Sequence, residues 1–105
     1  KQAYSVMGEI FCELASVMGS FGTGADIAKE SQKLLSEARM PPLPHSIGHG
    51  IGLDVHESPH LGKKSRDKLG GGNVLAIEPS AYFKGFGVRF EENVALGAGK
   101  KARVL

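Results

Sequence analysis

All four histidines of this 105-residue chain lie within residues 44–60, where three glycines alternate with them. The histidines are His45, His49, His56 and His60, and the glycines are Gly48, Gly50 and Gly52. Imidazole nitrogens bind divalent transition metals and exchange protons near neutral pH. Glycine lets the backbone bend and be approached closely. This combination is typical of a metal-binding or catalytic site.

Two glutamates further along the chain are candidate partners for these histidines. Glu78 is the only charged residue of the apolar run 74–79, and Glu91 follows in a second such run. A buried carboxylate must be paired, protonated or bound to a metal, because an isolated charge in apolar surroundings is very costly. One histidine and two glutamates suit Mn, Co, Zn or Fe. Simpler alternatives stay open: an ion pair between Glu78 and Arg89, a solvent-facing Glu91, and hydrogen-bonded structural histidines.

The elements expected to position these side chains begin with two helices. Apolar residues at three- and four-residue steps predict an amphipathic helix from Lys1 to Gly19. Its apolar face would carry Ala3, Tyr4, Met7, Ile10, Phe11, Leu14, Val17 and Met18. A second helix is predicted from about Gly24 to Arg39, begun by the capping-box spacing of Thr23 and Asp26 and ended by prolines.

A pair of strands is predicted after the histidine stretch. Asn73–Phe83 and Val88–Leu96 have strand composition, and Lys84–Gly87 between them is short enough for a hairpin loop. Because side chains alternate between the faces of a strand, Arg89 and Glu91 would share one face. Together with the helices, these strands predict an α+β fold in which two helices pack on a curved antiparallel sheet.

The same alternation applies to the histidine stretch. It places His45, Ile47 and His49 on one face, whereas His56 can join them only through a break in register. The interspersed glycines allow such a break.

Whole-chain composition excludes several classes of function. With 13 Lys and Arg against 11 Asp and Glu, the net charge of +2 gives no basic field for nucleic acid or a membrane surface. No apolar run approaches the length of a membrane span. The single cysteine, Cys12, cannot form an internal disulfide, which predicts a cytoplasmic location and a buried structural thiol.

Three ordered motifs resemble the C-terminal part of the pita-bread metallopeptidases, a family that includes methionine aminopeptidase, Xaa-Pro aminopeptidase, prolidase and creatinase. The motifs are His45-x-x-Gly48-His49-Gly50-x-Gly52-Leu53-x-x-His56-Glu57-x-Pro59, Ile77-Glu78-Pro79 and Val88-Arg89-Phe90-Glu91. The resemblance covers nearly the whole chain, because the predicted helices and strands also occur in the order of the family. It implies that residues 1–105 are a single domain, the C-terminal part of a catalytic domain.

The resemblance also implies roles for individual residues. His49 would be the histidine ligand of a metal, and Glu78 and Glu91 would be the glutamate ligands. Glu78 would in addition be the general base for the attacking water. His56 would contact the substrate carbonyl and stabilise the tetrahedral intermediate. Spacing and composition alone do not assign these roles.

Two further positions concern the substrate. His45 matches a histidine of the Xaa-Pro-cleaving and creatinase branches, where methionine aminopeptidases usually carry another residue. Arg89 would border the substrate and orient the ligands. A complete domain of this family holds two divalent ions, and two of its aspartate ligands come from earlier strands. Asp26, Asp54 and Asp67 are not in that context, so this chain can form at most a partial site.

The sequence therefore predicts part of a metal-dependent exopeptidase that hydrolyses the peptide bond before proline, as an aminopeptidase or a dipeptidase. The fragment is expected to be inactive alone. The expected partner is a peptide with proline at its second position, and the resemblance also admits a homodimer. Two alternatives are a methionine aminopeptidase and a non-catalytic pita-bread module that binds peptides or proteins.

Overall fold

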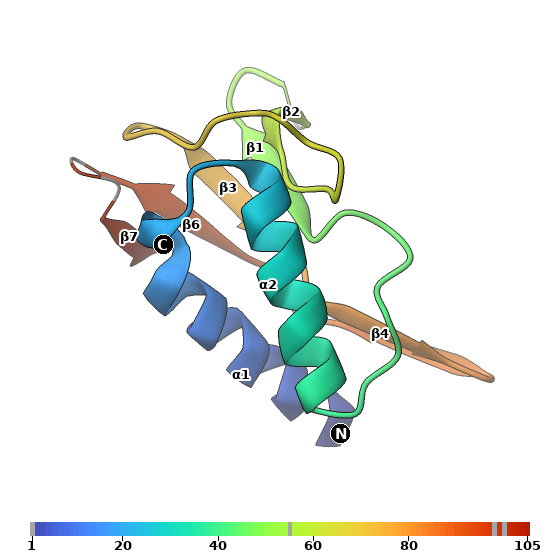
Figure 1. The fold of residues 1–105 in the computed structure, drawn as a ribbon. Coiled ribbons are helices and arrows are strands. Elements are labelled where there is room, and N and C mark those ends of the chain that lie inside the picture. The colour runs from blue at the N-terminus through green and yellow to red at the C-terminus, as the bar shows by residue number, and fades with distance from the viewer. Residues whose placement is uncertain (1, 55, 98, 100) are drawn as a thin grey trace.

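The computed structural model describes residues 2–54, 56–97, 99 and 101–105 (Figure 1). Helix α1 spans Gln2–Val17 and continues as a short 3-10 helix, η1, over Met18–Ser20. Helix α2 spans Gly24–Glu37. Both helices form where the apolar periodicity predicts them. The predicted start of the first helix at Lys1 lies outside the described residues.

Most of the predicted apolar face of α1 is buried, with two exceptions at its ends. Tyr4 and Val17 are exposed, and the Tyr4 ring packs on Phe90 at a centroid distance of 5.5 Å. The prediction that Cys12 is a buried structural thiol is wrong, since its side chain is exposed. Cys12 directly follows the buried Phe11, and one step of 100° around a helix carries it off the inward face.

The predicted capping box at the start of α2 is confirmed. The backbone N–H of Thr23 donates to Oδ2 of Asp26 at 3.1 Å, as does that of Gly22. These two backbone donors, Thr23 first, lower the pKa of Asp26 below its ordinary value. The helix ends at Glu37, two residues before the predicted end, and Arg39 adopts a positive φ of 60°. The carboxylate therefore fixes where α2 begins.

In the described part of the chain, seven strands form two antiparallel sheets, and helices α1 and α2 lie on one face of the larger sheet (Figure 1). The larger sheet has the strand order β2-β1-β3-β6-β7. Its strands are β1 (Gly48–Ile51), β2 (Glu57–His60), β3 (Val74–Ile77), β6 (Glu92–Leu96) and β7 (Ala102–Val104). The smaller sheet is a hairpin of β4 (Ser80–Phe83) and β5 (Phe86–Arg89), which projects from the body of the molecule. The predicted α+β class is confirmed.

Each of the two long predicted strands is divided into two shorter ones. The first is interrupted at Glu78 and Pro79, and the second at Phe90 and Glu91. On one side of the interruption β3 pairs with β6, and on the other side β4 pairs with β5. Proline has no N–H for a strand ladder, but the carbonyl of Pro79 still accepts from the N–H of Phe90 at 3.0 Å. The interruption places both candidate glutamates at the junction of the two sheets.

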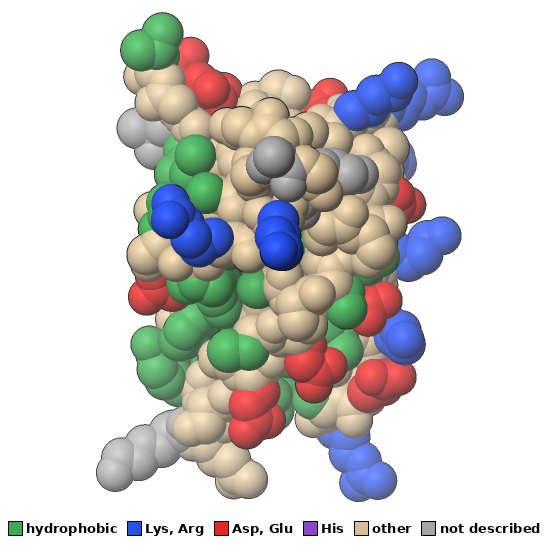
Figure 2. Space-filling view, turned by 90° about the vertical axis from the view of Figure 1, so that its left-hand side faces the viewer, with side chains coloured by type: hydrophobic (Ala, Val, Ile, Leu, Met, Phe, Trp, Pro, Cys, Tyr) green, Lys and Arg blue, Asp and Glu red, His purple; other side chains and the backbone are tan. Residues whose placement is uncertain are grey.

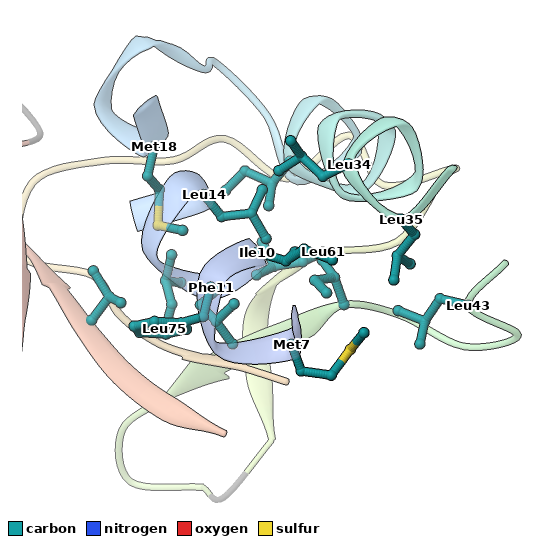
Figure 3. Close-up of a cluster of buried hydrophobic side chains, with 14 of the residues drawn as sticks. Met7, Ile10, Phe11, Leu14, Met18, Leu34, Leu35, Leu43, Leu61 and Leu75 are labelled. Carbon is teal, nitrogen blue, oxygen red and sulfur yellow. The ribbon is translucent and has the colours of Figure 1, made fainter. Parts of the chain in front are cut away.

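The hydrophobic core lies between the helices and the larger sheet. Figure 3 shows side chains from both helices meeting those from the strands and from the connecting segments. The labelled core residues are Met7, Ile10, Phe11, Leu14, Met18, Leu34, Leu35, Leu43, Leu61 and Leu75. Viewed from the β7 side, the surface shows apolar side chains interspersed with charged ones (Figure 2). No helix in the described part of the chain has the length and apolarity to cross a membrane.

Candidate functional site

The histidine stretch forms an antiparallel hairpin of β1 and β2 whose register shifts between His49 and Gly50. This confirms the predicted break in register. Close packing explains why residue 48 is a glycine, because a Cβ at this position would collide with the backbone carbonyl of Ala76 on β3. The prediction for Ile47 is wrong, since it is buried in the core instead of lying beside the histidines. The strand begins only at Gly48, so alternation of faces does not extend to the bent segment before it.

Pairing of β1 with β3 brings His49 and Glu78 together. Ala76 lies opposite His49, and Glu78, two residues further along, continues the same face. The N–H of Glu78 also donates to the carbonyl of Ile47 at 2.7 Å, which extends the pairing past the end of β3. As a result, Nε2 of His49 lies 3.0 Å from Oε2 of Glu78, and their side chains are only 13% and 15% exposed.

The second ring nitrogen determines what this pair can bind. Nδ1 of His49 lies 3.0 Å from the carbonyl oxygen of Gly50, which can only accept, so Nδ1 carries a proton. In a neutral ring, Nε2 then presents a lone pair to the carboxylate of Glu78. A lone pair and a carboxylate at this distance require a proton or a cation between them. A histidine whose other N–H donates to a backbone carbonyl is the usual arrangement of a metal ligand.

Arg89 occupies the other oxygen of the same carboxylate. Its Nη1 lies 3.4 Å from Oε1 of Glu78, and its Nη2 donates to the hydroxyl of Tyr82 at 3.1 Å. The ion pair that the sequence left open as an alternative is therefore present. The hydrogen bond between the two side chains lowers the pKa of Tyr82 and raises that of Arg89.

Tyr82 is a site residue that the sequence did not reveal. Its hydroxyl lies 2.7 Å from Nε2 of His45, and the two rings meet edge to face at a centroid distance of 5.6 Å. Gly87 lies opposite Tyr82 in the β4–β5 hairpin, and a Cβ there would come within 2.8 Å of the Tyr82 ring. The predicted hairpin loop at 84–87 is too long, since β5 already begins at Phe86. A two-residue turn would have placed Gly87 opposite Tyr82, and an aromatic residue opposite a glycine is the signal that could have found it.

Five of the predicted site residues line one cleft with a volume of about 270 Å³. They are His45, His49, His56, Glu78 and Arg89, and the other lining residues are Ser46, Gly48 and His60. The ring of His56 packs against that of His49 at a centroid distance of 4.2 Å and is exposed to solvent. The cleft thus joins the half-buried pair of His49 and Glu78 to histidines that a bound molecule can reach.

The predicted set of three metal ligands is only partly assembled. Among the described residues, no group of three or more His, Cys, Asp or Glu side chains is placed to hold a metal ion. Glu91 is exposed in the segment between β5 and β6 and does not line the cleft. Its charge is near enough to contribute, as the weakest of several causes, to the raised pKa of Arg89. His49 and Glu78 alone fit a divalent transition metal through their nitrogen and oxygen donors.

Comparison with known proteins supplies an independent view of this site. The model of metallopeptidase family M24 matches residues 1–98. Xaa-Pro aminopeptidase 3 from Rattus norvegicus is 30% identical over 98 residues, which is 83% of this chain and 19% of that protein. Xaa-Pro dipeptidase from Pyrococcus furiosus is 43% identical over 53 residues, which is 50% of this chain and 15% of that protein.

Solved structures agree with these sequence matches. A dipeptidase from Pyrococcus horikoshii OT3 has a TM-score of 0.82 and 33% identity, covering 96% of this chain and 29% of its own. A prolidase from Thermococcus sibiricus has a TM-score of 0.82 and 28% identity, covering 99% of this chain and 29% of its own. The chain therefore spans under a third of these structures and under a fifth of the curated relatives above.

Proposed function

Because the chain belongs to metallopeptidase family M24, we propose that it is the C-terminal part of a catalytic domain that hydrolyses the peptide bond before proline. The observation that carries this proposal is the approach of His49 and Glu78 to 3.0 Å inside a cleft that three further predicted site residues line. Relatives from several organisms are named Xaa-Pro aminopeptidases or Xaa-Pro dipeptidases, which supports the choice of substrate.

His49 and Glu78 are the proposed core of a metal site, with Glu91 as the third ligand from this chain. A bound divalent ion would supply a more acidic water and polarise the scissile carbonyl. A neighbour from Caenorhabditis elegans, 27% identical with a TM-score of 0.60, is described as having a di-nuclear active site. We accordingly propose two ions in the complete domain, with manganese as the specific candidate among Mn, Co, Zn and Fe.

The remaining side chains of the cleft would act on the peptide. The exposed ring of His56 is placed to contact the scissile carbonyl and to stabilise the tetrahedral intermediate. Glu78 has one carboxylate oxygen facing His49 and the other facing Arg89. It is the proposed acceptor of the proton from the attacking water. Arg89 holds the Oε1 side of that carboxylate and borders the substrate.

His45 is the proposed determinant of the preference for proline. It lines the same cleft and is exposed at its edge. An amide nitrogen of proline carries no N–H, so recognition must use shape and the carbonyl groups in place of a donated hydrogen bond. A methionine aminopeptidase is the alternative substrate class within the family.

A non-catalytic binding module is the second candidate function, and two observations favour it. Arg89 already pairs with the carboxylate of Glu78, and Glu91 is exposed and does not line the cleft. In such a protein the cleft would bind a peptide while His49 and Glu78 served only as a structural pair.

Metal titration distinguishes the two candidates. Calorimetry with Mn²⁺ should show binding to the wild-type chain and its loss in His49→Ala and in Glu78→Ala, because each substitution removes one of the two paired donors. His60→Ala is the matched control, since this histidine lines the same cleft outside the pair. Equal binding by the wild type and both pair variants would remove His49 and Glu78 from the ligand list.

Hydrolysis tests the substrate. The complete protein, supplied with Mn²⁺ or Co²⁺, should cleave Xaa-Pro peptides in preference to Met-Ala-type peptides, and His45→Ala should weaken that preference. Cleavage of the Met-Ala type alone would contradict the Xaa-Pro assignment. Cleavage of neither, together with peptide binding, would support the non-catalytic module.

Two coarser expectations accompany this function. A cytoplasmic location is proposed because the single cysteine is free and because the Caenorhabditis elegans neighbour is described as cytosolic. A homodimer is the second expectation, and light scattering of the purified protein measures it directly.

A further inference from the structure

Tyr82 connects the two sides of the cleft through its hydroxyl group. The hydroxyl accepts a hydrogen bond from Nη2 of Arg89 at 3.1 Å, and it lies 2.7 Å from Nε2 of His45. Arg89 in turn reaches Oε1 of Glu78 at 3.4 Å. The side chain of Tyr82 therefore links the proposed substrate histidine to the proposed metal ligand, although Tyr82 itself is 41% exposed.

The direction of these hydrogen bonds follows from the partner at each end. Nδ1 of His45 lies 2.8 Å from the carbonyl oxygen of Ser46, which can only accept, so Nδ1 carries the proton. In neutral His45 this leaves a lone pair on Nε2, which accepts the hydroxyl proton of Tyr82. The phenol oxygen is then free to accept from Arg89, which can only donate.

We propose that Tyr82 is a positioning residue of this cleft, which holds neutral His45 with Nδ1 protonated and couples it to Arg89 and Glu78. The effect of this contact on substrate preference rests on the proposed function, whereas the tautomer of His45 does not. With both ring nitrogens occupied, His45 presents no free polar atom to a bound peptide. That state suits a substrate whose amide nitrogen has no N–H to donate.

Two features of the hairpin support this role. Gly87, opposite Tyr82, leaves the space in which the aromatic ring lies, since a Cβ would come within 2.8 Å of the ring atom Cδ1. The Arg89 hydrogen bond also lowers the pKa of Tyr82, and a more acidic phenol is a stronger donor toward His45.

Tautomer measurement on the metal-free chain tests the proposal directly. Nitrogen-15 spectra at about pH 8, where an ordinary histidine is neutral, should show His45 protonated at Nδ1, with His45→Ala identifying its signals. In Tyr82→Phe the ratio of the Nδ1–H to the Nε2–H form should fall about three- to tenfold, the worth of one neutral hydrogen bond. An unchanged ratio would overturn the proposal.

Two further variants separate this role from a general disturbance of the fold. Gly87→Ala keeps the hydroxyl but displaces the ring, so the ratio should fall as in Tyr82→Phe. Tyr4→Phe removes the hydroxyl of the only other tyrosine, which makes no hydrogen bond to the described residues, and should leave the ratio unchanged. A fall in Tyr4→Phe equal to that in Tyr82→Phe would contradict a specific contact.

Kinetics of the complete protein then tests the consequence for catalysis. Tyr82→Phe should lower the preference for Xaa-Pro over Xaa-Ala peptides about three- to tenfold, chiefly through KM, and should have no further effect in a His45→Ala background. A changed tautomer in a protein without peptidase activity would sink the proposed function and leave the positioning role intact. An unchanged tautomer in an active peptidase would overturn the positioning role and leave the proposed function intact.

Discussion

The two sides of the cleft are built on different sheets and differ in their burial. His49 and Glu78 come from β1 and the end of β3, within the five-stranded sheet that the helices cover, and are 13% and 15% exposed. Tyr82 and Arg89 come from the projecting β4–β5 hairpin, and the side chain of Arg89 is 50% exposed. The proposed metal-binding pair therefore lies on the packed sheet, whereas Arg89, which borders the proposed substrate site, lies on the hairpin together with Tyr82.

This difference has an energetic meaning. Charges that are shielded from water interact more strongly than exposed ones. The half-buried pair of His49 and Glu78 can therefore hold an ion, while the exposed contacts contribute little to stability. Exposed contacts on a hairpin can also change between related proteins without disturbing the core. Glu78 takes part in both sides, because one carboxylate oxygen faces His49 and the other faces Arg89.

The largest expected effect comes from removing apolar side chains, and it should differ between the packed sheet and the projecting hairpin. Leu75 on β3 is fully buried, whereas Phe86 on β5 is 59% exposed and stacks on Phe83. Leu75→Ala should lower the free energy of unfolding by about 2–5 kcal/mol, and Phe86→Ala by about 1 kcal/mol. Chemical denaturation of both variants measures the difference. Similar losses would show that the hairpin contributes to the core as much as β3.

The next test acts on the approach of β1 to β3. Gly48→Ala places a Cβ against the backbone carbonyl of Ala76, which cannot yield without separating the strands. The expected cost is about 1–3 kcal/mol of unfolding free energy, together with loss of Mn²⁺ binding because His49 no longer reaches Glu78. Unchanged stability and metal binding would show that the strands tolerate the displacement.

The control for that variant is a glycine in the helical layer. In Gly8→Ala the new Cβ meets the Phe90 ring at 3.4 Å, an ordinary contact. Alanine is favoured over glycine inside a helix, so the chain should gain about 0.5–1 kcal/mol. Denaturation curves for the two variants should therefore move in opposite directions.

The packed part of the molecule was largely predictable from the sequence. Helix periodicity and the Thr23 capping box depend on local spacing, which the chain displays directly. A break in register also formed, between His49 and Gly50, among the glycines that were expected to allow one. The gathering of histidines with Glu78 and Arg89 in one cleft agrees with what the resemblance of their motifs to the pita-bread metallopeptidases implied.

What the sequence did not reveal depends on contacts between distant elements. The hydrogen bonds of Tyr82 exist only because the hairpin interruption at Pro79 turns β4 and β5 away from the larger sheet. The strand prediction extended through Pro79, although proline cannot donate to a strand ladder. Ile47 was placed wrongly because a pattern gives the period of an element but not where it starts. Cys12 was placed wrongly because its prediction rested on the cysteine count, which does not tell which helix face the residue occupies.

A smaller effect is expected from the exposed side of the cleft. Arg89→Lys keeps the charge, but a single ammonium cannot bridge Glu78 and Tyr82 as the two guanidinium nitrogens do. Stability should fall by at most about 1 kcal/mol. The pKa of Tyr82 should rise, because the hydrogen bond from Arg89 is the largest cause of its lowering. Absorbance titration in a Tyr4→Phe background measures that pKa. A loss of several kcal/mol of unfolding free energy in Arg89→Lys would contradict the expectation that the exposed side of the cleft contributes little to stability.

The smallest expected effect concerns two carboxylates that accept hydrogen bonds from backbone N–H groups on the packed side of the molecule, that of the exposed Asp26 and that of the partly exposed Asp67. Asp26 accepts from the N–H groups that begin α2, and Asp67 accepts from the N–H of His60 at 2.8 Å. For each carboxylate, a hydrogen bond from a backbone N–H is the largest cause of its lowered pKa. Each ionised carboxylate therefore adds stability above its unfolded pKa of about 3.9, and that stability is lost as the pH falls through the lower folded value.

Asp26→Asn and Asp67→Asn should each be less stable than the wild type at neutral pH, and the difference should vanish in strong acid, where the wild-type carboxylate is protonated too. Denaturation between about pH 2 and pH 7 gives the two curves for each pair. Neither carboxylate belongs to the β4–β5 hairpin, so acid should weaken the packed sheet and its helices while the hydrogen bond from Arg89 to Tyr82 persists. Simultaneous loss of that hydrogen bond at the same pH would show that the hairpin depends on the packed side for its own order.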